Sequence, residues 1–436
     1  MRVASIARAG RVTGAIVAIA VLAVSPAAAQ PATSIDRADT AWMIVATALV
    51  LMMTLPGLAL FYAGMVRKKN VLATMAQSLA ATALCSILWA AVGYSLAFAG
   101  DAPFLGTLDR LLLSGMGLDA VSPWAKTIPE ALFMIYQMTF AVITVALVSG
   151  SVADRMRFSA FLWFAALWLI VVYVPISHWV WGGGFLAAAG LIDFAGGTVV
   201  HLNAGVAGLV GALVLGARRG YGSENLAPYD LSLAVIGTGL LWVGWFGFNG
   251  GSALGANPRA VFAILTTHLA ACTGALTWMA LEWMRLGKPS VLGMISGAVA
   301  GLGAITPASG FVLPWHGVII GLAAGAVCYW SCTRLKFIFG YDDSLDVFGV
   351  HGVGGATGML LAGVFATRAI GNVSGLLEGH PNQVLIQLYG IGVTLVWSAF
   401  GTVVLLKLIS AFVPLRVDKQ SEIEGLDVAQ HGESLQ

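Results

Sequence analysis

The chain has 436 residues, of which 59% are hydrophobic and only 10% charged, and its mean hydropathy is +0.89. A soluble domain carries about 25% charged residues, so this composition excludes a soluble globular protein and requires lipid as the solvent. The formal net charge of +2 argues against a nucleic-acid partner, which would need a strongly basic surface.

Residues 1–29 have the pattern of a secretory signal peptide. Basic residues near the start precede the apolar run Ala15–Val24, and Ala27 and Ala29 form a small-residue cleavage site. A retained first transmembrane helix is the alternative, but the run is short and ends in Pro and small residues. We therefore expect cleavage after Ala29, with the mature N-terminus outside.

Eleven apolar segments follow, each long enough for the roughly 20 residues of a membrane-crossing helix. They are expected at about 41–64, 71–99, 129–153, 158–180, 197–217, 231–252, 260–284, 290–307, 312–333, 346–367 and 384–413. The predicted fold is an all-α membrane protein with eleven transmembrane helices. Its membrane domain would span residues 30–415, and a polar tail would follow at 416–436. The four cysteines lie in apolar stretches without CxxC pairing, so neither a disulfide framework nor a metal site is predicted.

Lys and Arg residues concentrate in alternate loops. Thirteen lie in the loops expected on the inside: Arg67, Lys68, Lys69, Arg155, Arg157, Arg218, Arg219, Arg285, Lys288, Arg334, Lys336, Arg416 and Lys419. The loops expected outside hold only four, Arg110, Lys126, Arg259 and Arg368, and Arg37 precedes the first span. Because short cytoplasmic loops carry the excess of basic residues, this pattern predicts a cytoplasmic C-terminus.

A lone titratable side chain lies in the fifth span. No Lys, Arg, Asp or Glu occurs between Ala195 and Ala217, yet His201 is there. Polar groups at membrane depth are costly and usually functional. The tenth span repeats the pattern: His201 opens HLNAGVAG, His351 opens HGVGGATG, and each has an aspartate upstream, Asp193 and Asp346.

The two histidine motifs are five spans apart, so the second copy enters the membrane from the opposite side. This indicates a five-helix inverted repeat, spans 1–5 and 6–10, followed by a final helix, which is a transporter architecture. A weaker echo links FYAG (Phe61–Gly64) in span one with FNGG (Phe248–Gly251) in span six. Such a repeat would bring His201 and His351 together as a neutral hydrogen-bonded pair. The alternative is two separate core histidines, each bonded to a backbone carbonyl.

Aromatic residues are concentrated near the outer ends of the expected spans. They are Phe140, Trp179, Trp181 and the WFGF run Trp245–Phe248. Aromatic faces attract cations by roughly 0.5–2 kcal/mol each. A neutral, histidine-lined path behind them would stabilise a charged substrate poorly. The pattern indicates that a cation is recruited and then crosses in another form.

Six motifs spread over nearly the whole mature chain: DFAGGTVVHLNAG (193–205), GWFGFNGGS (244–252), DVFGVHGVGG (346–355), DRMRFSAFLWF (154–164), VWGGG (180–184) and EGLDVAQHGE (424–433). By their residues and order the chain resembles the bacterial type of the ammonium transporters of the Amt/Mep/Rh superfamily. The resemblance implies a homotrimer in the bacterial inner membrane. Each subunit would have its own pore for ammonium or ammonia, and possibly for methylammonium, with no cofactor and no enzymatic activity.

The resemblance also assigns roles to particular residues. It implies an external recruitment site at Trp181, Phe140 and Ser252 and a stacked gate of Phe140 and Phe248. His201, His351 and Trp245 would line the pore, and Asp193 would order the outer mouth by hydrogen bonding. One departure is Tyr136, where the family's best-known bacterial members are expected to have Phe; its hydroxyl is expected to alter affinity without changing the substrate. The tail motif implies docking of a PII-type nitrogen regulatory protein.

Each assignment has a structural alternative. Phe140 and Phe248 could be ordinary core aromatics, Trp181 an interfacial belt residue and Ser252 a helix cap, and Asp193 could simply favour a helix N-terminus. Three other functions also stay open. The first is an ammonium sensor, although the tail is short for a signalling domain, and the second is an intramembrane metalloenzyme, although two histidines make a poor ligand set. The third is a Rh-like gas channel, against which the signal peptide and the tail motif argue.

Overall fold

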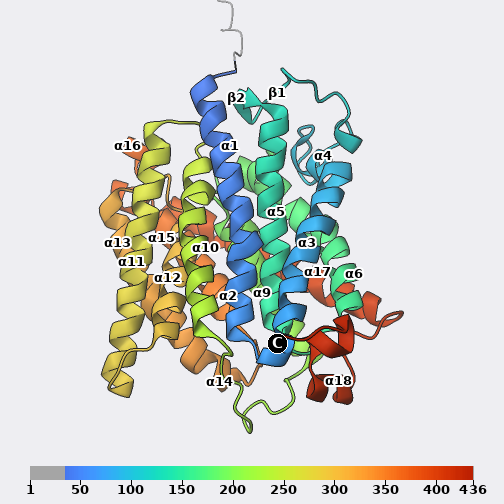
Figure 1. The fold of residues 1–436 in the computed structure, drawn as a ribbon. Helices are drawn as coiled ribbons and strands as arrows, with labels where there is room; N and C mark the ends of the chain where they lie inside the picture. The colour runs from blue at the N-terminus through green and yellow to red at the C-terminus, as the bar shows by residue number, and fades with distance from the viewer. Residues whose placement is uncertain (1–34, 436) are drawn as a thin grey trace, which may run out of the picture. The chain divides into compact units, whose positions relative to one another are not determined.

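The computed structural model describes residues 35–435, so the expected signal peptide lies outside the described residues. Within them, ten helical segments are long and apolar enough to cross a membrane: Arg37–Met65, Lys68–Phe98, Glu130–Val152, Phe158–Ala188, Gly197–Leu215, Leu231–Gly251, Pro258–Leu286, Pro314–Phe339, Phe348–Phe365 and Asn382–Ser410. They correspond to ten of the eleven expected spans. Long helices run side by side as a bundle (Figure 1), and the protein is an all-α membrane protein.

The eighth expected span, 290–307, differs from the prediction. It is the helix α12 (Val291–Ile305), whose 15 residues are fewer than the roughly 20 that cross a bilayer. The chain continues beyond it without helix through Thr306, Ala308 and Ser309, all of which are fully buried. Irregular backbone at membrane depth is tolerated where protein surrounds it, and α11 and α13 pack on α12.

Four of the spans are unbroken α-helices: α5 (Glu130–Val152), α10 (Leu231–Gly251), α11 (Pro258–Leu286) and α17 (Asn382–Ser410). The other spans are interrupted or preceded by π-helical turns, labelled η: α1 (Arg37–Met52), η1 (Met53–Leu58) and α2 (Ala59–Met65); α3 (Val71–Leu88), η3 (Trp89–Gly93) and α4 (Tyr94–Phe98); α6 (Phe158–Trp168), η5 (Leu169–Tyr173), α7 (Val174–Trp181) and α8 (Phe185–Ala188); η6 (Gly197–Leu202) and α9 (Asn203–Leu215); α13 (Pro314–Trp330), η7 (Ser331–Leu335) and α14 (Lys336–Phe339); η8 (Phe348–Gly352) and α15 (Val353–Phe365). Both histidines therefore lie in π-helical turns, which occur frequently at functional sites.

The remaining elements are short. They are the antiparallel hairpin β1 (Val121–Ser122) and β2 (Ala125–Pro129), the helices α16 (Arg368–Gly371) and α18 (Lys419–Glu424), the π-helical turn η10 (Asp427–His431), and the 3₁₀ turns η2 (Lys68–Asn70), η4 (Leu111–Leu113) and η9 (Leu376–Glu378). Figure 1 shows the hairpin at one end of the bundle and α18 at the other.

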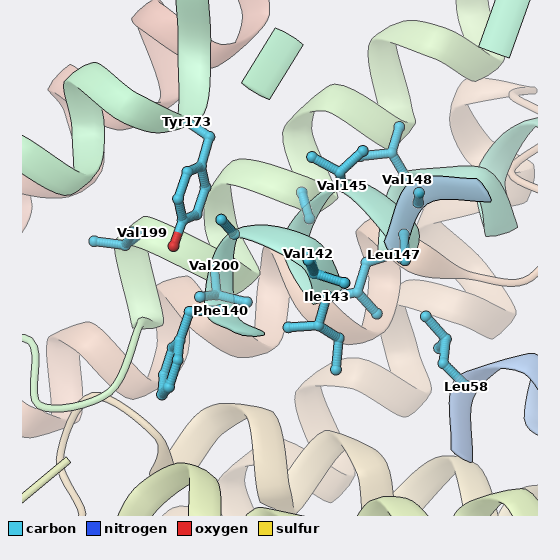
Figure 2. Packing of buried hydrophobic residues seen from close by; sticks show 14 of the residues in the cluster. Leu58, Phe140, Val142, Ile143, Val145, Leu147, Val148, Tyr173, Val199 and Val200 are labelled. Atoms are coloured by element: carbon cyan, nitrogen blue, oxygen red, sulfur yellow. The ribbon is translucent and has the colours of Figure 1, made fainter. Parts of the chain in front are cut away.

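Helix α5 forms the centre of the buried core. From Thr139 to Val152 every residue of this helix is buried, and Figure 2 shows its Phe140, Ile143 and Leu147 packed with residues of η1 and η6, including Leu58 and Val200. A helix that is apolar on all sides is stable only when other elements surround it. Its position in the core lets α5 present Phe140 to one cavity and Ile143 and Leu147 to another, both described below.

Arginines and acidic residues form a network at the end of the bundle that carries the C-terminal tail, which we call the basic end. Arg218 bonds to Asp342 through two nitrogens, with N···O distances of 2.8 and 2.9 Å, and lies 3.6 Å from Asp154. Burial by itself raises the pKa of the Asp342 carboxyl, but the hydrogen bonds and charge of Arg218 outweigh burial and lower it. The network joins the chain after α5 and α9 to the loop before η8.

The C-terminal tail packs against the basic end. An Asp427 carboxylate oxygen accepts a hydrogen bond from the Ala73 amide at 2.8 Å, which caps the N-terminal turn of α3. The Leu426 amide donates to Asn70, and Asn70 in turn donates to Asp154 of the network. The segment that carries the EGLDVAQHGE motif is therefore attached to the bundle in this structure.

Candidate functional site

Three cavities follow one another through the bundle. The aromatic cavity, with a volume of about 230 Å³, lies far from the basic end and is lined by Phe98, Trp124, Phe133, Gln137, Phe140, Val180, Trp181, Phe194, Ser252 and Leu254. The central chamber, about 10 Å³, is lined by Met53, Leu58, Phe61, Ile143, Leu147, Val200, His201, Leu241, Trp245, Phe248, Val299 and His351. The basic-end cavity, about 260 Å³, shares His351, Phe61 and Val299 with the chamber and also contacts Arg218, Glu282 and Asp346.

The aromatic cavity unites the three residues expected to recruit a cation. The rings of Phe140 and Trp181 meet edge to face, with centroids 5.8 Å apart and an angle of 89°. Ser252 also lines the cavity, and its hydroxyl donates to the Phe248 carbonyl at 2.8 Å. Since that bond uses the hydroxyl hydrogen, the oxygen keeps acceptor capacity for a donor in the cavity.

Two stacked rings separate the aromatic cavity from the central chamber. Phe140 and Phe248 are 4.1 Å apart between centroids and 23° from parallel. Phe140 lines the aromatic cavity and Phe248 lines the chamber. The stacked pair therefore lies between the linings of the two cavities.

His201 and His351 lie next to each other in the central chamber. Their Nδ1 atoms are 3.2 Å apart, and the rings are 13° from parallel. At this distance one neutral ring donates its Nδ1–H and the other accepts it. Trp245 stacks on His201 at 5.4 Å and donates its indole N–H to Thr306 at 2.8 Å. The chamber is therefore walled by apolar groups and by two imidazoles that bond to each other through Nδ1, while the His201 Nε2 atom has no hydrogen-bond partner among the described residues.

Two glycines make the close approach of the histidines possible. A Cβ atom on Gly205 would meet the backbone of Gly352 at 2.2 Å, and a Cβ on Gly355 would meet Leu202 at 2.9 Å. Each glycine stands four residues after its own histidine and contacts the residue that follows the other one. This reciprocal contact is the geometry of a two-fold axis between the repeats, and it explains the shared glycine of the two motifs.

Asp193 binds the start of η6. One carboxylate oxygen accepts from the amides of Gly196 and Gly197 at 2.8 and 2.7 Å. The other accepts from the amide and hydroxyl of Thr198 at 2.8 and 2.5 Å, and from the Val199 amide at 3.4 Å. An anion at a helix N-terminus satisfies amides that have no partner within the helix. Asp193 is not among the residues that line the aromatic cavity, but its carbonyl accepts the indole N–H of Trp181 at 2.8 Å.

The pairing of Asp193 with Asp346 across the repeat is wrong. The counterpart of Asp193 is Asp343, which also stands eight residues before its histidine and accepts the amide of Phe348, five residues on, at 2.7 Å. Asp346 instead forms an ion pair with Lys336 at 2.8 Å and lines the basic-end cavity. Burial, followed by the charge of Asp346, raises the pKa of the Asp343 carboxyl.

Sequence reasoning assigned three of the ten residues that line the aromatic cavity and missed the others, among them Trp124, Gln137 and Phe194. Trp124 comes from the β1–β2 hairpin, and its ring fills the space beside Gly183, where a Cβ would lie 2.7 Å from the indole. Gly183 has φ +83°, a left-handed conformation that favours glycine. The GGG run after Trp181 was a sequence signal for a tight backbone contact, although it did not identify the partner.

Metal-binding groups and disulfides are not evident at the site. In residues 35–435 no three His, Cys, Asp or Glu side chains lie close enough to hold a metal ion. All four cysteines are free, and Cys85, Cys328 and Cys332 are buried among apolar residues.

Comparisons with known proteins agree with this architecture. The model of the Ammonium Transporter Family matches residues 41–435. An ammonium transporter of Aquifex aeolicus is 50% identical over 92% of this chain and 93% of its own length, and one of Bacillus subtilis is 48% identical over 91% and 97%. The crystal structure of Candida albicans Mep2 aligns with a TM-score of 0.84 at 39% identity over 92% of this chain and 90% of that one. A structure described as a Sensor Amt Protein aligns with a TM-score of 0.83 at 29% identity, covering 90% and 98%. Since the family model and these relatives cover nearly all of the described residues, the chain belongs to the ammonium transporter family.

Proposed function

We propose that the protein takes up ammonium by recruiting the cation in the aromatic cavity, where it transfers its proton to water near the Phe140–Phe248 gate, and by conducting the resulting ammonia past His201 and His351. The observation that carries the proposal is the order of the cavities: a site with π faces and a hydroxyl oxygen lies before a chamber of about 10 Å³ walled by apolar groups and two imidazoles. Ammonium transport itself follows from family membership.

Recruitment uses the particular chemistry of the ammonium ion. Trp181 and Phe140 offer π faces, each worth roughly 0.5–2 kcal/mol to a cation. Ser252 offers an oxygen that accepts an N–H bond. Potassium carries the same charge but has no hydrogen to donate, so it cannot form the directed N–H···O bond that Ser252 accepts from ammonium.

Deprotonation follows from the size and polarity of the central chamber. Its volume suits about one water-sized molecule, so an ion must shed its hydration shell to enter. Placing a bare charge in such a site costs several kcal/mol even after the protein relaxes. A neutral ammonia molecule avoids that cost and can bond to the free imidazole nitrogens. Trp245 supports this role by fixing the ring plane of His201.

Asp193 acts on the mouth of the path rather than on the cation in this mechanism. Its carboxylate already accepts five hydrogen bonds from residues 196–199. Its carbonyl positions Trp181. The same aspartate thus holds both the recruiting indole and the turn that carries His201.

The proposal extends to the membrane and the assembly. The basic end would face the cytoplasm of a bacterial inner membrane, because short cytoplasmic loops carry the excess of Lys and Arg. A cleaved signal peptide would precede residue 30, and three copies would form a trimer with one path per subunit. The tail motif, attached to α3 through Asp427, would contribute to the surface on which a PII-type regulator closes the basic-end cavity.

Current and pH recordings on proteoliposomes test the function. With an inward ammonium gradient we expect uptake that saturates with concentration, and with an equal potassium gradient we expect no uptake and no current. The internal pH distinguishes the transported species: net entry of ammonia alkalinises the lumen, whereas net entry of ammonium does not. Equal uptake of potassium and ammonium would rule out the proposed filter.

A further inference from the structure

The hydroxyl of Tyr136 lies at the C-terminal end of α10, the helix that carries Trp245, Phe248 and Ser252. Tyr136 projects from α5 and is fully buried. Its Oη atom is 2.9 Å from the Phe248 carbonyl oxygen, 3.0 Å from the Gly247 carbonyl oxygen and 3.3 Å from Ser252 Oγ. One phenol therefore touches the backbone of a gate residue and the side chain of the recruiting serine.

The carbonyl groups at this helix end need partners from outside the helix. The last four carbonyls of an α-helix have no intrahelical donor. α10 ends at Gly251, and the Ser252 amide turns back to the Asn249 carbonyl at 3.2 Å. The Phe248 carbonyl thus accepts from two hydroxyls, that of Ser252 at 2.8 Å and that of Tyr136 at 2.9 Å.

Space for the phenol is built into α10. A Cβ on Gly251 would lie 2.6 Å from the Tyr136 oxygen, so glycine at this position leaves room for the hydroxyl. The Tyr136 ring also meets Phe140 edge to face, with centroids 5.0 Å apart. Tyr136 does not line the aromatic cavity, so any effect on the cation has to pass through the groups it contacts.

We propose that Tyr136 is a positioning residue of the outer site: its hydroxyl caps the carbonyl end of α10 and holds the Ser252 oxygen in the orientation that accepts an N–H bond from the cation. A phenol proton on the Gly247 or Phe248 carbonyl keeps the last turn of α10 in place, and the turn carries Ser252. The inference rests on the proposed function for the role of Ser252 as an acceptor. It adds a residue that sets affinity without touching the substrate.

Tyr136→Phe removes only the hydroxyl and keeps the ring against Phe140. A hydrogen bond of this kind is worth about 0.5–1.5 kcal/mol, so we expect the half-saturating ammonium concentration to rise about two- to tenfold. The maximal uptake rate is expected to stay unchanged, because the central chamber lies beyond the altered contacts. Tyr94→Phe is the matched control, since it removes another buried phenolic hydroxyl, one that bonds to Glu130 at 2.9 Å and not to α10.

A double-mutant cycle with Ser252→Ala tests whether Tyr136 acts through Ser252. We expect Ser252→Ala to raise the half-saturating concentration and Tyr136→Phe to add little in that background, because coupled residues are not additive. Full additivity of the two changes would overturn the inference, as would a Tyr136→Phe protein with wild-type half-saturation. In those cases a raised value for Ser252→Ala alone would leave the proposed recruitment site standing, whereas an unaltered value would overturn both.

Membrane amounts and the thermal midpoint of each purified variant separate affinity from folding. If Tyr136→Phe does not reach the membrane, Gly251→Ala replaces it: the added methyl group displaces the Tyr136 hydroxyl and keeps the tyrosine. The same rise in half-saturating concentration is expected, and a wild-type value would count against the inference.

Discussion

Replacing Asp193 with Asn should destabilise the protein and abolish most of its transport. The carboxylate accepts five hydrogen bonds, two on one oxygen and three on the other. Asn keeps one acceptor oxygen and turns an NH₂ group toward at least two backbone amides. Each buried donor left without a partner costs about 1–3 kcal/mol, so the loss of two should lower the free energy of unfolding by about 2–6 kcal/mol.

Transport should be lost because η6 begins where Asp193 binds. Once the amides of Gly196 and Gly197 lose their partner, the turn that carries His201 loses its fixed start. The Trp181 indole keeps its hydrogen bond, because it bonds to the backbone carbonyl of residue 193, which the substitution leaves in place. Thr198→Val is the graded control: it removes one donor and leaves the carboxylate four, so it should cost about 1 kcal/mol and preserve transport.

Denaturant or thermal unfolding of the purified protein, together with ammonium uptake in proteoliposomes, measures both effects. Wild-type stability combined with lost uptake in Asp193→Asn would refute the reasoning, because the carboxylate would then act on the cation and not on the loop. Wild-type values in both assays would show that the five hydrogen bonds are dispensable.

Four further predictions concern separate parts of the molecule. Trp181→Leu removes one π face and should raise the half-saturating concentration for ammonium or methylammonium several-fold, since the face is worth about 1 kcal/mol; unchanged concentration dependence would argue against the site. Current recordings on the His201→Ala/His351→Ala protein distinguish two roles for the pair. Potassium should enter if the pair filters ions, and the ammonium current should be lost if the pair relays protons. Wild-type potassium rejection together with wild-type ammonium current would mean that the pair does neither. Deleting residues 421–436 should prevent capture of a PII-type protein by membranes when nitrogen is abundant, and normal capture would remove the tail from regulation. Arg218 lowers the pKa of the Asp342 carboxyl below its ordinary value of 3.8, against the opposing effect of burial. The ion pair therefore stabilises the fold fully above that pH, and its contribution is lost as the pH falls through the lowered pKa. The thermal midpoints of wild type and Asp342→Asn should converge at acid pH, and a difference that stays constant with pH would contradict the assignment.

Several features of the molecule are readable from the sequence because they depend on local composition. A helix in lipid must satisfy its backbone internally and present apolar side chains, so apolar runs of about 20 residues mark the spans, and ten of the expected spans are helices of spanning length. The eighth span was predicted too long. Its helix ends at Ile305, and the chain that follows is irregular and buried at Thr306, Ala308 and Ser309. Hydropathy alone does not show where a helix gives way to buried irregular backbone.

The juxtaposition of the two histidines was also predictable. Two copies of a motif that are an odd number of spans apart enter the membrane from opposite sides, which indicates a two-fold axis in the membrane plane. Equivalent residues near such an axis lie close together. His201 and His351 have Nδ1 atoms 3.2 Å apart, and the glycines four residues after them allow the approach. The sequence motif predicts this contact because its own residues, the histidine and the glycine four positions later, form the contact between the two helices.

Hydrogen bonds and ring contacts between distant segments were decided only by the tertiary structure. Asp346 is the aspartate nearest in sequence to His351 and looked like the mate of Asp193. The turn is instead held by Asp343, because it stands eight residues before His351, as Asp193 does before His201, and this spacing brings its carboxylate to the Phe348 amide at the start of the turn. Trp124 reaches the aromatic cavity from a hairpin, and Tyr136 reaches the end of α10 from α5. A linear pattern carries no information on such partners, since side-chain contacts depend on how helices far apart in the chain pack in three dimensions.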